Sequence, residues 1–355
     1  MFLACAAPTI PTDRSGGRAF DSSSGQTPHS SATAMQTLNS LRCLAGLDEA
    51  GLGPILGPMV VAGVALEGPA GCDPWSALAA AVTRNRPRER QIQVADSKKV
   101  HQGAAGFARL ERTVLGFWAA WTGGIPTTIE GLLAKTATDL NRLRRCPWYS
   151  ELDVALPLAN RREDLELTGH LLAAAMNDAR IVAVHATALA VDVEEFNATI
   201  AATDNKSDTH LRHYVRVLAD LLAQTPPQAH VIADRAGGRA HYQRSLAKAF
   251  PGASVQRIQE SESVSSYAIQ QADGERRVTF ATGGEERAFP TALASCFAKY
   301  VRELLMHTLN DWFALRIPGL RRTAGYWVDG QRFLADIDSY LSSHSLPRER
   351  LVRVR

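Results

Sequence analysis

Residues 47–54, LDEAGLGP, place two adjacent acids, Asp48 and Glu49, at the end of an apolar segment and just before the turn Gly51-Leu52-Gly53. Neighbouring side chains of a strand point to opposite faces, so we expect the glycines to bend the backbone and bring both carboxylates to one site. Converging carboxylates repel one another unless protons or cations neutralise them, which indicates a hard divalent metal. The backbone N–H groups of such a turn can also bind a phosphate or a sugar hydroxyl.

Two further acids lie where active sites are often built. Asp234 ends the apolar segment HVIAD, and Glu303 lies in a long predicted helix beside Lys299 and Arg302. Sites of open α/β sheets gather at strand ends, and oxygen ligands without histidine or cysteine favour Mg²⁺ or Mn²⁺ over zinc. Two such ions about 4 Å apart are the usual arrangement for phosphodiester hydrolysis. Taken singly, the Asp-Glu pair and Glu303 are more often solvated side chains than ligands, and Asp234 is also consistent with a helix cap.

Composition is that of a soluble globular protein. The 355 residues are 45% hydrophobic and 21% charged, and no apolar run approaches the roughly 20 residues of a membrane span. The net charge of +3 does not indicate nucleic acid by itself, so any basic surface must be local. The five cysteines form no C-x-x-C pair, which argues against zinc and for a reducing compartment. We expect a cytoplasmic monomer without a signal peptide.

The chain divides into a leader and one domain. Residues 1–38, rich in Ser, Thr, Gly, Ala and Pro, are predicted to be disordered, and Met35 is a candidate for the true first residue. A native peptide from residues 1–34 in mass spectrometry would exclude that start. The domain spans 39–345, with an insertion predicted within 100–165 and a hairpin insertion near 265–285.

The elements that must position the acids follow from apolar periodicity. Strands are predicted at 42–48, 59–66, 181–189, 230–234, 254–259 and in a hairpin around Asp273-Gly274. Helices are predicted at 167–180, 193–202, 209–223, 239–250, 289–315 and 331–341. This mixture predicts an α/β fold with a central mixed sheet flanked by helices.

The segment LDEAGLGPILGPMVVAGVAL resembles the opening of type 2 ribonucleases H, the ribonuclease HII and HIII group, which begins D-E-A-G-R-G and continues with G-P and an apolar strand. Further similar segments follow in the family's order: ADSKKV (95–100), VDVEEFNATIAAT (191–203), VIADRAGG (231–238), ALASCFAKYVRELLM (292–306) and Gly325-Tyr326. The similarity covers about residues 40–340 with gaps, and the chain resembles a diverged member.

The resemblance implies a ribonuclease H-like fold and a metal-dependent endoribonuclease. Such an enzyme hydrolyses RNA in RNA–DNA hybrids, or at ribonucleotides embedded in DNA, and leaves a 3′-hydroxyl and a 5′-phosphate. The implied catalytic and metal-binding quartet, holding two Mg²⁺ or Mn²⁺ ions, is Asp48, Glu49, Asp234 and Glu303. The implied substrate-binding residues are Gly51, Leu52 and Gly53 at the ribose 2′-hydroxyl, Lys98, Lys99, Lys299 and Arg302 at phosphates, and Tyr326 near the junction sugar.

Three departures from the family pattern leave alternatives open. Leu52 stands where the family has arginine, Glu303 where it has aspartate, and Arg235 where it has glycine. The longer Glu303 side chain would shift a metal by about 1 Å, and displacements of that size can cost on the order of 100-fold in rate. A catalytically weakened or inactive hybrid-binding protein of the same fold, and a two-metal nuclease acting on DNA, are therefore the alternative functions.

Overall fold

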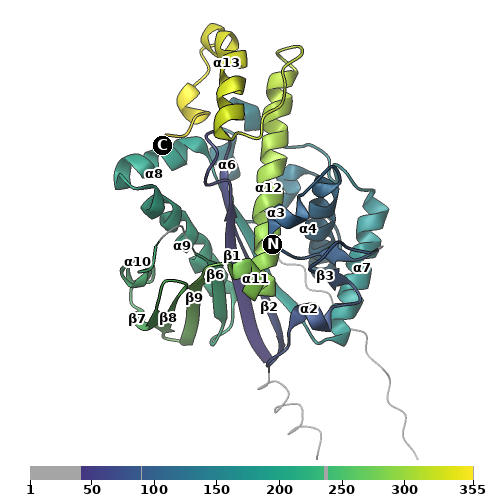
Figure 1. Ribbon diagram of the computed structural model, residues 1–355, viewed down its shortest axis with the longest axis vertical. Helices are drawn as coiled ribbons and strands as arrows, with labels where there is room; N and C mark the ends of the chain where they lie inside the picture. The colour runs from purple at the N-terminus through teal and green to yellow at the C-terminus, as the bar shows by residue number, and fades with distance from the viewer. Residues whose placement is uncertain (1–40, 89, 236–238, 355) are drawn as a thin grey trace, which may run out of the picture. The chain divides into compact units, whose positions relative to one another are not determined.

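The computed structural model describes residues 41–88, 90–235 and 239–354 (Figure 1). The predicted leader 1–38 and Met35 lie outside the described residues, as do Ala236, Gly237 and Gly238. Within the described part, no helix is long and apolar enough to cross a membrane.

A seven-stranded mixed sheet forms the centre of residues 41–354, with the order β5-β2-β1-β6-β9-β8-β7. Its strands are β1 (Leu41–Ala50), β2 (Met59–Pro69), β5 (Val182–Val191), β6 (His230–Asp234), β7 (Ser254–Glu260), β8 (Val264–Gln271) and β9 (Gly274–Ala281). The pairs β1–β6 and β6–β9 are parallel, whereas β1–β2, β2–β5, β7–β8 and β8–β9 are antiparallel. The predicted α/β class with a central mixed sheet flanked by helices is confirmed.

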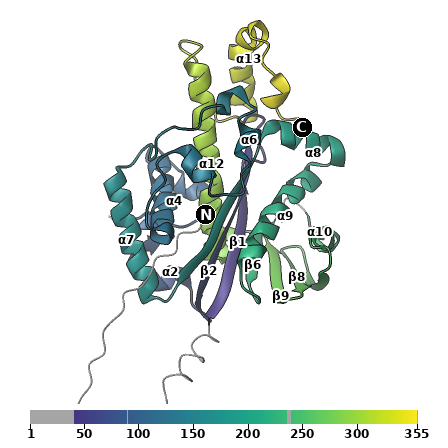
Figure 2. The same cartoon turned by 180° about the vertical axis from the view of Figure 1, so that it is seen from behind.

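Helices cover both faces of this sheet. Figures 1 and 2 show α12, α4 and α7 on one side of β1 and β2, and α9 on the other. The longer helices are α4 (Gly106–Thr122), α7 (Arg162–Asp178), α8 (Val193–Thr203), α9 (Lys206–Gln224), α12 (Phe289–Ala314) and α13 (Trp327–Ser343). The shorter ones are α2 (Pro74–Ala77), α3 (Ser97–Val100), α5 (Ile129–Leu133), α6 (Leu140–Leu143), α10 (Gln243–Ala249) and α11 (Gly284–Arg287), with 3₁₀ turns at Pro147–Tyr149 and Arg348–Arg350. The short strands β3 (Val82–Thr83) and β4 (Ile92–Gln93) pair separately.

Alternation along the strands separates two apolar cores. On β2, Val60, Ala62 and Val64 join the core beneath α4 and α12, whereas Met59 and Val61 join the core beneath α9. This period of two is what a strand buried on both faces requires. It also fixes the face to which every residue of the neighbouring β1 points.

The region 100–165 and the hairpin near 265–285 are integral to the packing. Glu111 of α4 is fully buried and accepts hydrogen bonds from the N–H groups of Leu158, Ala159 and Asn160 and from the Tyr300 hydroxyl of α12. The predicted hairpin forms between β8 and β9, and β9 pairs directly with β6. That these segments are insertions stays a prediction.

Candidate active site

Asp48 and Glu49 point to opposite faces of the sheet. The expected bend is absent, because β1 continues through both acids to Ala50 and pairs Asp48 with Ala62 and Glu49 with Val61. Asp48 is buried near Ser295 of α12, whereas the Glu49 carboxylate lies 3.3 Å from Nε2 of the buried His210 of α9. The two acids therefore end one strand and leave it on opposite faces.

Asp234 lies beside Asp48 on the neighbouring parallel strand. The register pairs Leu47 with Ala233, so each aspartate is the next residue along its strand and both follow the same alternation. The Tyr214 hydroxyl donates to the carbonyl oxygens of Leu47 (3.0 Å) and Asp234 (3.1 Å), which fixes the two strand ends together. Oδ1 of Asp234 accepts a hydrogen bond from the Gly284 N–H at 3.0 Å.

The charges of these acids act on one another. Burial raises the pKa of Asp48 well above its ordinary value, and the nearby Glu49 and Asp234 raise it further. Burial and the charge of Glu49 likewise raise the pKa of Asp234, although its backbone hydrogen bond from Gly284 opposes this. Mutual repulsion of this kind is typical of carboxylates that share a site without a compensating cation.

Glu285 is a further acid of this site, and we call Asp48, Glu49, Asp234 and Glu285 the acid cluster. The sequence predictions did not include Glu285. It lies in α11, directly after β9, and its Oε2 is buried without a hydrogen-bond partner among the described residues. Burial raises its pKa, as do the charges of Asp234 and Asp96. A signal for Glu285 is present in the sequence, since an apolar strand is followed by Gly-Gly and an acid, and Asp234 was selected because it also ends a strand. Glu285 was left out because its segment was interpreted as part of an insertion.

Glu303 is not brought together with the other three acids. It lies eight residues beyond Ser295 on α12, which corresponds to about 12 Å along the helix. Its carboxylate pairs with Nζ of Lys299 at 2.5 Å and lies 3.6 Å from the guanidinium of Arg302. Burial alone would raise its pKa, but these two cations outweigh burial and hold the pKa below the ordinary value. The charge of Glu303 is thus already compensated.

The glycine turn is held from inside the protein. Gly51 has φ +86°, and a Cβ there would lie 2.4 Å from Nε of Arg302. Arg302, expected at a phosphate, is instead 1% exposed and donates to the carbonyl oxygen of Ala324 at 3.0 Å. The buried Arg353 donates to the carbonyl oxygens of Gly51 and Gly57. Two buried guanidinium groups therefore support the turn.

The remaining predicted substrate residues differ in accessibility. Lys98 and Lys99 are exposed on α3; Lys98 lowers the pKa of Glu285, and Lys99 pairs with Glu286 at 2.9 Å. Lys299 is half-buried and paired with Glu303. Tyr326 is 54% exposed, Gly53 is exposed, and Leu52 packs partly against the core beneath α9. Lys98 is thus the predicted cation with a direct electrostatic link to the acid cluster.

The donor chemistry of the cluster suits Mg²⁺ or Mn²⁺, since its ligands are carboxylate oxygens. The acids repel one another, and one oxygen of Glu285 has no hydrogen-bond partner among the described residues. A divalent cation would neutralise this negative charge. Within the described residues, no three His, Cys, Asp or Glu side chains stand in a finished metal-ligand arrangement. Binding would therefore require side-chain rotation, with Asp48, Asp234 and Glu285 as the nearest donors.

Several solved structures resemble this chain. Over most of its length, the chain resembles ribonucleases HII and HIII. It matches the RNase HII of the PCNA complex from Archaeoglobus fulgidus at 18% identity and TM-score 0.39, covering 88% of this chain and 94% of that one. It matches ribonuclease H2 from Pyrococcus horikoshii OT3 at 12% identity and TM-score 0.39 (87% and 92% covered), and Bst-RNase HIII in complex with Mn²⁺ at 16% and 0.35 (94% and 73%). No family model and no curated protein matches the chain.

Proposed function

We propose that this protein is a metal-dependent endoribonuclease that cleaves RNA in RNA–DNA hybrids or at ribonucleotides embedded in DNA. The observation that carries the proposal is the cluster of mutually repelling carboxylates at the ends of β1, β6 and β9. The order of sequence motifs that resemble type 2 ribonucleases H supports the choice of substrate. The proposed acids are Asp48, Glu49, Asp234 and Glu285, with Glu285 replacing Glu303.

Each proposed residue has a role that its surroundings support. Asp48, Asp234 and Glu285 would hold divalent cations, and Glu49, on the other face of β1, would join after side-chain rotation. When bound, two such ions activate water and stabilise the leaving oxygen. The Gly51 turn would offer backbone N–H groups to the ribose 2′-hydroxyl, the group that distinguishes RNA from DNA. The exposed Lys98 would contact a phosphate.

The test is cleavage of three labelled duplexes in the presence of Mg²⁺ or Mn²⁺: an RNA–DNA hybrid, DNA with one ribonucleotide, and all-DNA. We expect cleavage of the first two, a 5′-phosphate and 3′-hydroxyl at the cut, and no reaction in EDTA. Asp48→Asn and Asp234→Asn should abolish the reaction. Cleavage that Asp48→Asn leaves unchanged would refute the proposal, and equal cleavage of all-DNA would favour the two-metal DNA nuclease.

A hybrid-binding protein without turnover is the second candidate. It is favoured by the incomplete convergence of the acids and by Leu52, which replaces a charged family residue. Tight hybrid binding that is independent of metal, with no cleavage in Mg²⁺ or Mn²⁺, would support it. Restored cleavage in Leu52→Arg would instead identify an enzyme that has lost one contact.

A further inference from the structure

A basic groove lies on the α9 side of the sheet, away from the helix α12. It has a volume of about 1120 Å³ and runs between α9, α10 and β7. We define the basic groove by its five cationic side chains: Arg212, Arg239, Arg244, Lys248 and Arg257. Its acidic side chains are Asp208 and Glu260.

Both acids of the basic groove are already paired. Asp208 pairs with Arg239, and Glu260 pairs with His241 at 2.8 Å and with Arg257 at 3.4 Å. Among the described residues, the exposed Arg212, Arg244 and Lys248 have no anionic partner. Arg244 and Lys248 are four residues apart on α10, so their side chains lie about 6 Å from each other along one helix face. The groove therefore carries positive charge that the protein does not neutralise.

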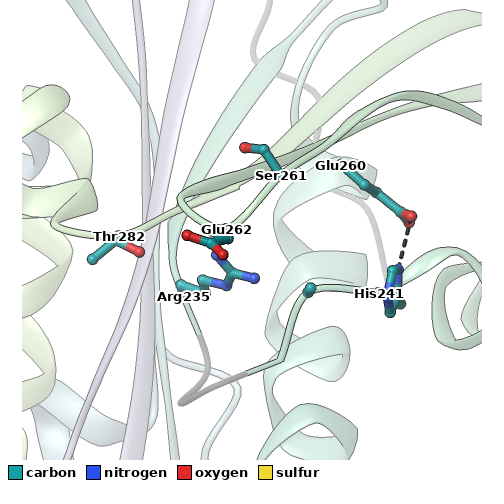
Figure 3. Close-up of a pocket in the computed structure, with 7 residues that line it drawn as sticks. Arg235, His241, Glu260, Ser261, Glu262 and Thr282 are labelled. Carbon is teal, nitrogen blue, oxygen red and sulfur yellow. Dashed lines mark hydrogen bonds and ion pairs between the residues drawn. The ribbon is translucent and has the colours of Figure 1, made fainter.

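A smaller hollow of about 410 Å³ leads from the basic groove towards the acid cluster. It shares His241 and Glu260 with the groove and is also lined by Arg235 and Thr282 (Figure 3). Arg235 directly follows Asp234, and Thr282 directly follows β9. Figure 3 shows Thr282 at one side of this hollow, Arg235 next to the acidic Glu262 in its middle, and the His241–Glu260 pair at the other side. A nucleic-acid strand that leaves the acid cluster can thus continue over the hollow into the basic groove.

We infer that the basic groove binds the sugar–phosphate backbone of the nucleic acid, outside the cleaved linkage. This inference rests on the proposed function for its ligand. A row of separate, exposed cations matches the evenly spaced phosphates of a nucleic acid better than it matches the surface of a folded protein partner. Contacts with phosphates hold a duplex in place without reading its sequence. The groove would fix the direction in which the substrate leaves the acid cluster.

The test measures binding by full-length protein in an Asp48→Asn background, so that the duplex stays intact. A fluorescent hybrid of about 24 base pairs is titrated at several salt concentrations between about 50 and 200 mM. The double variant Arg244→Ala/Lys248→Ala is compared with Lys135→Ala/Arg161→Ala, which removes two exposed cations that line neither hollow. Circular dichroism and the unfolding midpoint show that each variant is folded.

We expect the groove variant to bind about tenfold or more weakly and to lose about 2 from the slope of log K against log salt, since each phosphate contact contributes about 1. The Lys135/Arg161 variant should bind like its parent. An all-DNA duplex should lose affinity to the same extent, because backbone contacts carry no sequence information.

Three results would overturn the inference: unchanged affinity and salt slope in the groove variant, an equal loss in the Lys135/Arg161 variant, or no binding of any nucleic acid by the parent. Equally strong competition by polyglutamate of matched charge would assign the groove to an acidic peptide instead. Cleavage assays separate this inference from the proposed function. Unchanged binding with normal wild-type cleavage refutes only the groove, whereas weakened binding without wild-type cleavage refutes only the nuclease.

Discussion

Glu285 and Glu303 are both partly buried glutamates, yet their neighbours shift their pKa values in opposite directions. Asp234 and Asp96 add negative charge around Glu285, whereas Lys299 and Arg302 surround Glu303 with positive charge. A carboxylate among acids gains from a cation, but a carboxylate among cations has little need of one. The surroundings of each side chain, more than its place in a motif, therefore favour Glu285 over Glu303 as the proposed metal ligand.

This choice predicts unequal effects of two isosteric substitutions. Glu285→Gln should lower hybrid cleavage by at least about 100-fold, since it removes a charged ligand and displaces the remaining ones. Glu303→Gln should lower it far less. Initial rates at saturating Mn²⁺ measure both. A severe loss in Glu303→Gln with a mild loss in Glu285→Gln would show that Glu303, as the resemblance implies, is the fourth acid of the site.

The opposite pKa shifts also predict opposite pH dependence of stability without metal. The folded pKa of Asp48 lies above its ordinary 3.8, so its contribution to folding is full below that value and is lost as pH rises through the folded pKa. Asp48→Asn should therefore gain stability over wild type as pH rises towards neutrality. The folded pKa of Glu303 lies below 4.5, so its contribution is present above 4.5 and is lost as pH falls.

Urea unfolding in EDTA, from acid to neutral pH, measures the free energies of unfolding of wild type, Asp48→Asn and Glu303→Gln. Glu303→Gln should be less stable than wild type at neutral pH and approach it in acid. Differences that do not vary with pH, or that vary in the same direction for both variants, would contradict the electrostatic description of the cluster.

At the scale of elements, the turn after β1 depends on packing from distant parts of the chain. Arg302 of α12 fills the space beside Gly51, and Arg353, near the described C-terminal end, donates to the turn's carbonyl oxygens. The amide of Ile55 also donates to the carbonyl oxygen of Gly325 at 2.8 Å, which connects the turn to the segment before α13. The glycines thus permit close packing and a left-handed backbone, but they do not bend the acids together.

Gly51 and Gly53 form a matched pair that tests this description. A Cβ at Gly51 would lie 2.4 Å from Nε of Arg302 at a backbone φ of +86°, whereas a Cβ at Gly53 has no atom within 4 Å. Gly51→Ala should lower the free energy of unfolding by about 1 to 3 kcal/mol, and Gly53→Ala should change it by less than about 0.5 kcal/mol. Denaturant unfolding measures both, and equal effects would show that the turn adapts freely.

Local patterns predicted the elements well where apolar periodicity was strong. β6 has the predicted bounds His230–Asp234, and β2 begins at the predicted Met59. Helix α9 begins three residues before the predicted start at residue 209, because Asn205 caps it by accepting from the N–H groups of Ser207 and Asp208. The strand-end pattern marks Glu285 as a candidate, but its place beside Asp234 depends on the parallel pairing of β9 with β6, a contact between segments far apart in sequence.

For the molecule as a whole, the net charge of +3 conceals a separation of charge. Acids gather at the ends of β1, β6 and β9, and unneutralised cations gather in the basic groove beyond them. Composition correctly indicated that a basic surface would be local, but only the packing of α9, α10 and β7 brings Arg212, Arg244 and Arg257 to one groove. Uncompensated acids lower stability, and they persist in proteins where a ligand neutralises them.

Binding of a divalent metal at the acid cluster should therefore raise the free energy of unfolding of the whole protein. Ions that bind only the folded protein stabilise it by mass action, by about 2.7 kcal/mol at 100 times the dissociation constant. Mn²⁺ should raise the unfolding midpoint of wild type, and the rise should shrink in Asp48→Asn and Glu285→Gln but persist in Glu303→Gln. Because this readout requires no turnover, it separates a lost metal site from a lost catalytic step. A midpoint that Mn²⁺ leaves unchanged in wild type would mean that the acid cluster holds no metal without substrate.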